Sequence, residues 1–389
     1  CNGLRTTDHG QGVMNFDFKD KEIAIREKLR ELFDPDSRAA LEKLEGEEIQ
    51  QIRDQVLQWL RKLGQIGYLA LGLENGKDGV SMLAAQETLA TISPSLFLSV
   101  EVTARLFGRL VASFGTPEQK DKILPAIKEG QLIGAVALSE TGMSIENAPL
   151  QTTALSMDGG FQLDGTKGHV VNAPIADWIA VAGNWEENIV LFLIEKDAEG
   201  LSMGQRLSTL GYNGATISPI SFENCFAPSN ALMGPFKQEN LPKTLRMWED
   251  QILTAGSLGL MHRSFDTARA YAKNHESGGK PIIAYQEVGF KLAEILTLLH
   301  TAQLLAYRAA WMVETGDREA GVLVHCAKVF CSESAEEVAS SALQILGGKG
   351  YVQGNPAEEG YRNAKYLRIA GTSSEISRMR IADEVLRNE

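Results

Sequence analysis

The first third of the chain places its apolar residues with the spacing of amphipathic helices. The stretch KEIAIREKLRELF (21–33) predicts one apolar face, and residues 47–67 repeat the pattern. The apolar positions of the first stretch are Ile23, Ile25, Leu29 and Leu32. Further helices are predicted over 79–92, 95–114 and 117–129. Thr116 is expected to cap the last of these helices, with Pro117 at its first position.

Between about residues 133 and 234 the pattern changes to that of β-strands. Short runs of β-branched and aromatic residues alternate with turn residues. These runs are LIGAVALSE (132–140), FQLDGTKGHVVNAP (161–174), WIAVAGNW (178–185), NIVLFLIEK (188–196) and SPISFEN (218–224). No long helix separates them, which favours an antiparallel barrel or sandwich. No GxGxxG motif opens a helix here, so dinucleotide binding by a Rossmann unit is unsupported.

From about residue 241 the helical pattern returns in longer and more apolar stretches. Three are predicted, over 245–274, 284–316 and 318–346. Helices this apolar pack against several partners, as in a bundle core or an oligomer interface. The chain is therefore predicted to be an α+β protein. Its parts are a flexible leader (1–15), an N-terminal helical domain (16–131), a middle β-domain (132–239) and a C-terminal helical bundle (240–389).

Composition narrows the classes of partner. With 389 residues the chain is longer than one hydrophobic core accommodates, so two or three packed parts are expected. Its net charge of −12 argues against nucleic acid and anionic membranes as binding partners. No apolar run reaches the ~18 residues of a membrane span. The four cysteines form no metal-binding spacing, so no metal is expected and a reducing, cytoplasmic location is the simplest.

Several motifs resemble the acyl-CoA dehydrogenase family, in its order and at its spacing. They are FGTPEQKDKILPAIKEGQLIGAVALSE (114–140), LDGTKGHVVNAPIADWIAVAG (163–183), GYNGATISPISFENCFAPSNALMG (211–234), AGSLGLM (255–261), GKPIIAYQ (279–286) and ALQILGGKGYVQGNPAEEGYRNAKYLRI (342–369). The resemblance implies an N-terminal helical domain, a middle antiparallel β-barrel or sandwich and a C-terminal four-helix bundle. It also implies FAD, an acyl-CoA thioester, an electron-transfer flavoprotein as acceptor and a homo-oligomer, either dimer or tetramer.

The resemblance also implies where the catalytic base should be. Most of the family carries it as the Glu of a terminal YEGT motif, but here Gly371, or Ala370 in a gapped alignment, takes that place. Isovaleryl and long-chain type members instead use a Glu nine residues before an LGL stretch, which is Glu249 here. The alternative is that Glu249 is a first-turn acid that stabilises the helix dipole. Asp250 stands where the family generally has Arg, and a second carboxylate could raise the pKa of Glu249.

The resemblance assigns cofactor contacts along the whole chain. The candidates are Leu138, Ser139, Gly142, Ser144, His169, Val171, His275, Gln286, Gln344, Gly347, Gly348, Ser373 and Glu375. Three positions depart from the family. His169 replaces an aromatic residue near the flavin ring, and Gly278 replaces a Phe. His275 replaces an Arg that pairs with the FAD pyrophosphate across the subunit interface, and His is a weaker phosphate ligand.

Three functions remain open from the sequence. The first is FAD-dependent acyl-CoA dehydrogenation with Glu249 as base. The second is a non-catalytic or flavin-poor partner subunit of an α2β2 heterotetramer. The replacement of the family's Arg by His275 and of its Phe by Gly278 agrees with such a subunit. The third is other flavin-linked chemistry by a diverged member. The visible spectrum of the purified protein separates the second from the others, because bound flavin is coloured.

Overall fold

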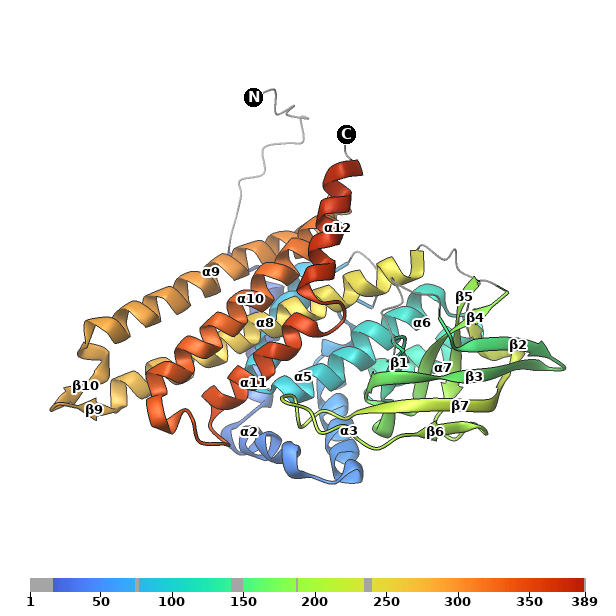
Figure 1. The fold of residues 1–389 in the computed structure, drawn as a ribbon, viewed down its shortest axis with the longest axis horizontal. Helices are drawn as coiled ribbons and strands as arrows, with labels where there is room; N and C mark the ends of the chain where they lie inside the picture. The colour runs from blue at the N-terminus through green and yellow to red at the C-terminus, as the bar shows by residue number, and fades with distance from the viewer. Residues whose placement is uncertain (1–16, 74–76, 141–149, 187, 234–239, 388–389) are drawn as a thin grey trace.

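The fold combines helices at both ends of the chain with a β-domain between them (Figure 1). The computed structural model describes residues 17–73, 77–140, 150–186, 188–233 and 240–387. The predicted leader and the candidates Gly142 and Ser144 lie outside the described residues.

The N-terminal part is helical, as the periodicity predicted. Its helices are α1 (Asp20–Leu32), α2 (Pro35–Glu42), α3 (Ile49–Gln65), α4 (Gly79–Ile92), α5 (Pro94–Glu101), a π-helical stretch (Val102–Gly108), α6 (Arg109–Phe114) and α7 (Pro117–Lys128). The helix predicted over 95–114 is thus three joined segments. The predicted cap of α7 is confirmed: the Thr116 hydroxyl accepts a hydrogen bond from the Gln119 amide at 3.2 Å, and Pro117 is the first helical residue.

One predicted core position of α1 is wrong. Ile25 and Leu29 are buried, but Ile23 is 43% exposed and points away from the core. Glu22 is buried instead, because its carboxylate accepts hydrogen bonds from the Ser81 hydroxyl at 2.5 Å and the Lys19 amide at 2.8 Å. A buried carboxylate with two donors can occupy a core-facing position that hydrophobicity alone assigns to an apolar residue.

The middle part is one twisted sheet with the order β6-β7-β3-β2-β4-β5-β8, and β1 also pairs with β4. The strands are β1 (Gly134–Ala137), β2 (Thr153–Met157), β3 (Gly160–Val171), β4 (Trp178–Trp185), β5 (Asn188–Glu195), β6 (Leu201–Met203), β7 (Ile217–Pro228) and β8 (Leu232–Met233). Most pairs are antiparallel, as predicted, but β1 and β2 each pair with β4 in parallel.

Two side chains fasten the β-domain to the N-terminal helices. Asn172, fully buried after β3, donates from its amide to the backbone carbonyl of Ser99 at 2.8 Å. Asp177, just before β4, accepts from the Arg53 guanidinium at 2.7 Å and from the Ile133 amide at 2.9 Å. These bonds fix the start of β1 relative to the helices, and the end of β1 carries two of the candidate cofactor residues.

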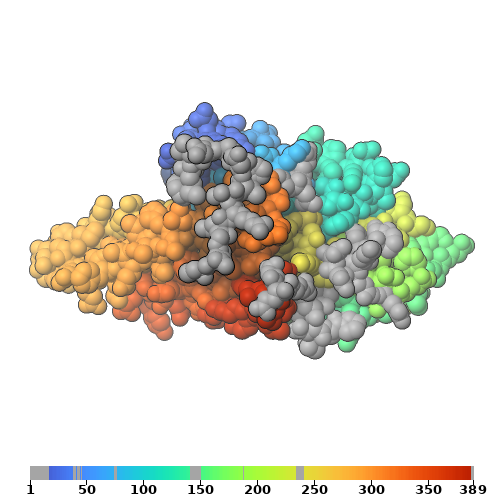
Figure 2. All heavy atoms as spheres, turned by 90° about the horizontal axis from the view of Figure 1, so that it is seen from above, coloured from blue at the N-terminus to red at the C-terminus, as the bar shows by residue number. Residues whose placement is uncertain are grey.

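The C-terminal part is a bundle of long helices. It consists of α8 (Asn240–Asn274), α9 (Gln286–Thr315), α10 (Ala320–Leu346), α11 (Pro356–Ile369) and α12 (Ser374–Arg387). A small hairpin of β9 (Glu276–Ser277) and β10 (Lys280–Pro281) joins α8 to α9. The end of the molecule formed by this hairpin projects beyond the other helices, opposite the β-domain (Figure 2).

Helix α9 is unusually apolar for a surface helix. One 18-residue window has a mean hydropathy of 1.2, which meets the length and composition of a membrane span although the sequence predicted none, and only 22% of that window is buried. A bundle helix satisfies the same criteria. Three large residues on its outer face are more than half exposed: Phe290, Leu304 and Trp311.

Candidate active site

The candidate base and the turn that lacks the YEGT carboxylate lie against each other. Glu249 lies well inside α8, and Gly371 lies in the turn between α11 and α12. A Cβ atom built on Gly371 would be 3.4 Å from both the Cβ and the Oε2 atom of Glu249, and 3.2 Å from the Cδ1 atom of Leu253. The two positions that the sequence analysis linked are therefore one place in the fold.

The position of Glu249 rules out the helix-dipole alternative. Helix α8 begins at Asn240, so Glu249 is not in its first turn, where the dipole of a helix acts. Its side chain keeps 22% of its surface exposed. This partial exposure leaves a route by which a ligand can reach the carboxylate.

Arg246 holds the Glu249 carboxylate in an ion pair. Its Nη1 atom lies 2.5 Å from Glu249 Oε2, one helical turn away, and its own side chain is 2% exposed. A charge-assisted hydrogen bond of this kind fixes the direction in which the carboxylate points.

Asp250 does not belong to this site. It is fully buried on another face of α8, where its Oδ2 atom lies 2.7 Å from the His325 Nδ1 atom of α10. The expectation that Asp250 acts beside Glu249 as a second carboxylate is therefore not supported by the direction of its side chain.

Lys328 anchors the turn that carries Gly371. Its ammonium group, contributed by α10, donates to the backbone carbonyl oxygens of Arg368 at 3.2 Å and Thr372 at 2.7 Å. Burial lowers the pKa of Lys328, and the Asp250 charge opposes that shift. Gly371 adopts a φ of +66° inside this turn, a conformation that favours glycine. The clamp and the glycine together bring the turn onto α8.

Two tyrosine rings in tilted contact form a wall next to Glu249. The rings of Tyr212 and Tyr366 lie 4.8 Å apart, and the Tyr212 hydroxyl also lies near Gly256 on α8. Burial and then the Glu249 charge raise the pKa of Tyr366 above its usual range. Both phenols therefore stay neutral, and the wall presents uncharged aromatic surface to the base.

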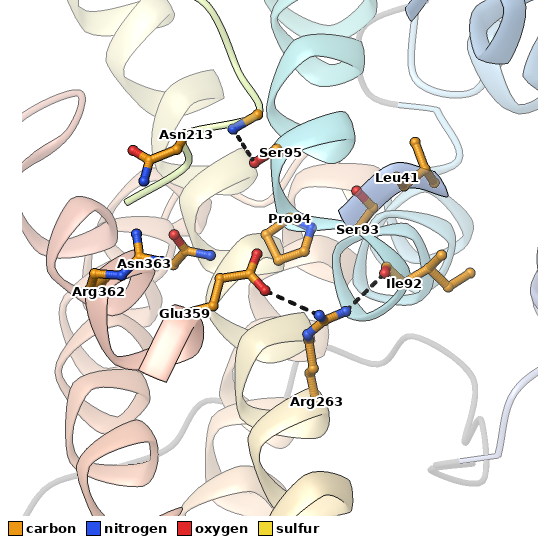
Figure 3. Close-up of a pocket in the computed structure, with 11 residues that line it drawn as sticks. Leu41, Ile92, Ser93, Pro94, Ser95, Asn213, Arg263, Glu359, Arg362 and Asn363 are labelled. Carbon is orange, nitrogen blue, oxygen red and sulfur yellow. Dashed lines mark hydrogen bonds and ion pairs between the residues drawn. The ribbon is translucent and has the colours of Figure 1, made fainter. Parts of the chain in front are cut away.

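A small polar pocket holds the Tyr212 loop in place (Figure 3). Asn363 of α11 accepts a hydrogen bond from the Tyr212 amide at 2.6 Å. Arg263 of α8 lies between the Ile92 carbonyl at 3.1 Å and the Glu359 carboxylate at 3.2 Å, as Figure 3 shows. The pocket joins α4, α8, α11 and the loop before β7. It is a packing junction that positions the aromatic wall.

The candidate cofactor residues of the β-domain form one group. Leu138 and Ser139 follow β1, and His169 and Val171 lie on β3; the Gly168 amide donates to the Ser139 carbonyl at 3.1 Å, which ties the two segments together. His169 is exposed and Leu138 is buried.

A buried ion pair supports this group. The Lys167 ammonium lies 2.9 Å from Glu140 Oε1, and burial lowers the pKa of Lys167 to about 8. Burial alone would raise the pKa of Glu140, but hydrogen bonds from Thr152, from the Gln151 amide and from Lys167 lower it to about 2.

A second group of candidates lies at the opposite end of the molecule (Figure 1). His275 follows α8 and stacks on Tyr271 with ring centroids 4.7 Å apart, and Gln286 begins α9. Lys349 lies with its ammonium 5.7 Å from the Tyr271 ring centroid, which brings the turn after α10 to the same place. The candidates of that turn are Gln344, Gly347 and Gly348, all exposed. One chain thus separates its predicted cofactor contacts into two distant sets.

The remaining candidates open α12, next to the turn of Gly371. Hydrogen bonds from its own amide and from the Ser373 hydroxyl lower the pKa of Glu375. In the part of the chain that the structure describes, three buried hydroxyls here have no hydrogen-bond partner: Thr372, Ser374 and Ser377. Buried hydroxyls that lack a partner, next to the exposed Glu375 carboxylate, fit a site that binds a polar group of a cofactor.

Sequence reasoning missed the two cations of this site. Arg246 precedes Glu249 by three residues, a spacing at which ion pairs form on a helix, so its pairing was detectable. Lys328 stands in an otherwise apolar stretch of α10, which was also a signal. Its acceptors at Arg368 and Thr372 are backbone atoms of a distant turn, which no spacing in the sequence indicates.

Family comparison agrees with the fold. Models of the acyl-CoA dehydrogenase N-terminal, middle and C-terminal domains match residues 19–131, 135–225 and 247–386. Isovaleryl-CoA dehydrogenase of Oryza sativa subsp. japonica is 33% identical over 318 residues, which are 78% of this chain and 76% of that protein. The chain belongs to the acyl-CoA dehydrogenase family. Members of this family are FAD-dependent oxidoreductases that dehydrogenate acyl-CoA thioesters.

Two further similarities cover almost the whole chain. Benzylmalonyl-CoA dehydrogenase of Aromatoleum aromaticum is 27% identical over 387 residues, 96% of this chain and all of that protein. A solved chain described with the electron transferring flavoprotein of Acidaminococcus fermentans is 26% identical, with a TM-score of 0.88 over 96% of this chain and all of that one. The acyl-CoA dehydrogenase architecture therefore extends through the described residues.

Proposed function

We propose that this acyl-CoA dehydrogenase uses Glu249 as its base and removes an α-proton and a β-hydride from an acyl-CoA thioester. The observation that carries the proposal is the contact between Glu249 and Gly371. A carboxylate is required near the α-carbon, and the position where most of the family carries it is glycine. Glu249 is the carboxylate whose side chain fills the space beside that glycine.

The residues of this chain have separate tasks in the reaction. The Glu249 carboxylate accepts the α-proton, and Arg246 holds it in position before the substrate arrives. The tyrosine wall excludes water, so that the enolate-like charge interacts with fixed dipoles instead of solvent. FAD, when bound, supplies the acceptor for the β-hydride and helps to polarise the thioester oxygen.

The two distant sets of cofactor candidates favour an oligomer. The β-domain set and the α12 residues of one chain would hold the flavin end of FAD, and the set around His275 would reach the FAD of a neighbouring copy. The exposed apolar face of α9 provides surface for such an assembly. A homo-oligomer, dimer or tetramer, is the simplest form, with an electron-transfer flavoprotein as the acceptor.

The test is anaerobic mixing of the flavin-containing protein with a panel of acyl-CoA thioesters. Substrate should bleach the visible flavin band, and Glu249→Gln should slow the bleaching by about 10²- to 10⁴-fold while retaining the flavin. The exposed Glu31→Gln variant serves as the control and should behave as wild type. Equal bleaching rates in Glu249→Gln and wild type would remove Glu249 from the mechanism.

The replacement at His275 supports a second candidate, a flavin-poor subunit that completes the site of a related chain. In that case the protein purified alone would be colourless, and flavin would appear only with the partner chain. Flavin at about one per chain in the protein alone argues against this candidate. The same preparation therefore decides between the two functions before any substrate is added.

A further inference from the structure

The cation next to the candidate base is built into the protein interior. Arg246 is 1% exposed as a residue, and its neighbours Leu245 and Trp248 on α8 are equally buried. Burying a guanidinium costs several kcal/mol unless strong pairs compensate. Because a buried ion pair generally adds little net stability over apolar residues of similar volume, stability alone is a weak reason for an arginine here.

The pair with Arg246 has a chemical cost for a base. The guanidinium donates to Glu249 Oε2 and so occupies a lone pair of the carboxylate that would otherwise face the substrate. The α-proton of an alkyl thioester is only weakly acidic, so a base whose oxygen is held at 2.5 Å by a guanidinium is poorly placed to remove it. Catalysis improves if the bound substrate itself takes over part of the guanidinium.

A carboxylate on the substrate would do this. The guanidinium carries five N–H donors in a planar fork, enough to bind a second carboxylate in a bidentate pair while Glu249 is released from its own. We propose that Arg246 selects acyl groups that carry a carboxylate on the β- or γ-carbon, that is, CoA monothioesters of short dicarboxylic acids. The proposal rests on Glu249 as the base.

The distances agree with a short acyl group. Glu249 must come within hydrogen-bond reach of the α-proton, and Arg246 Nη1 lies 2.5 Å from the Glu249 carboxylate. The guanidinium therefore lies within about 6 Å of the substrate α-carbon. A carboxylate on the β- or γ-carbon can span that gap together with one hydrogen bond, whereas one at the end of a long chain would lie well beyond it.

Charge complementarity favours this ligand over a neutral polar group. The tyrosines beside Glu249 stay neutral and supply aromatic surface, and Asp250 is turned toward His325. An anion bound at Arg246 would thus gain the guanidinium charge, and neither the two phenols nor Asp250 would add a negative charge directed at it.

The experiment compares succinyl-CoA with butyryl-CoA, which have the same number of acyl carbons, in the flavin-containing oligomer. Wild type should show a higher kcat/KM for succinyl-CoA by about 30-fold or more, the effect of a buried charge pair. Arg246→Met should abolish this preference, so that the ratio of the two kcat/KM values falls to about one whatever the absolute rates. Arg246→Lys, which keeps the charge but loses the fork, should retain part of the preference.

A binding measurement makes the result independent of turnover. A succinyl thioether analogue that cannot be dehydrogenated should bind wild type at least about 30-fold more tightly than Arg246→Met, and a butyryl thioether analogue should bind both alike. If wild type treats both thioesters equally and both analogues lose affinity alike in the variants, the carboxylate proposal is overturned while Glu249 stands. If no thioester bleaches the flavin, the proposed function fails, and the two analogues still decide what Arg246 binds.

Discussion

Gly371 and Glu249 occupy adjoining parts of one small volume, because a Cβ atom at position 371 would lie 3.4 Å from the Glu249 carboxylate oxygen Oε2. A longer side chain at 371 would have to displace either Glu249 or Leu253. A carboxylate in the turn and a carboxylate on α8 would therefore compete for the same volume. This competition offers a physical reason for a glycine in the turn to accompany a glutamate on the helix.

Gly371→Ala should impair catalysis more than its effect on folding accounts for. The alanine Cβ would crowd Leu253 at 3.2 Å and touch Glu249 at 3.4 Å, and the φ of +66° is strained for any L-residue by about 1–2 kcal/mol. We expect a lower kcat with flavin retained, measured by stopped-flow bleaching. We also expect the free energy of unfolding in denaturant to fall by about 1–2 kcal/mol, the size of the backbone strain. Gly159→Ala is the control, since its φ is +78° with no atom within 4 Å. An equal fall of kcat in both variants would show that strain alone is responsible.

Lys328→Met should loosen the turn that seats Gly371. The variant loses two hydrogen bonds to backbone carbonyls and removes a positive charge that acts on the buried Asp250 carboxylate. We expect a destabilisation of about 2–4 kcal/mol and faster amide hydrogen exchange confined to residues 368–374.

A surface lysine gives the comparison for that variant. Lys365 is exposed and pairs with Glu336 at 3.1 Å, so Lys365→Met should cost no more than about 1 kcal/mol and should leave the turn unchanged. Exchange in Lys328→Met that matches wild type over residues 368–374 would show that other contacts hold the turn. The activity of the variant would then be expected to stay normal.

The elements that result from the regular spacing of apolar residues were predictable from the sequence, whereas the features that depend on long-range polar contacts were not. Helices α4, α8, α9 and α10 appear close to their predicted bounds because their apolar residues recur with helical spacing. Ile23 was misplaced because the hydrogen-bonded Glu22 takes the buried position beside it. The parallel pairing of β1 and β2 with β4 was also unpredictable, because strand pairing depends on connections between strands and not on the composition of each strand.

The candidate site shows the same division. Glu249 could be proposed from a resemblance in spacing, and its contact with Gly371 agrees with that alignment. Whether Asp250 shares the site could not be read from its position next to Glu249, since adjacent residues on a helix point about 100° apart. The pairing of Asp250 with His325 depends on the packing of α8 against α10.

The β-domain should lose stability in acid through Glu140. Its pKa is lowered from 4.5 to about 2 in the folded protein, so the stabilisation is complete above the unfolded value and is lost as pH falls from about 4.5 to about 2. Glu140→Gln should reduce the steepness of the stability profile in that interval, as followed by thermal unfolding. Thr152→Val removes one donor to Glu140 and should move the acid limb to higher pH. An unchanged acid limb in both variants would assign it to other carboxylates.

His275→Arg should strengthen the retention of FAD if the set of residues around His275 serves the cofactor of a neighbouring copy. His275 stacks on Tyr271 at the end of the molecule remote from the β-domain, and an arginine there would add a permanent charge able to bind phosphate in a bidentate manner. We expect the dissociation constant for FAD to fall about 10-fold and to become more sensitive to salt, measured by flavin fluorescence on dilution. Lys273→Arg, on an exposed face two residues earlier, controls for the added guanidinium. A gain that is equal in both variants would reflect a guanidinium anywhere on this end of the molecule and not position 275. A gain in His275→Arg that disappears when the oligomer is diluted to monomers would show that this residue serves another subunit's cofactor.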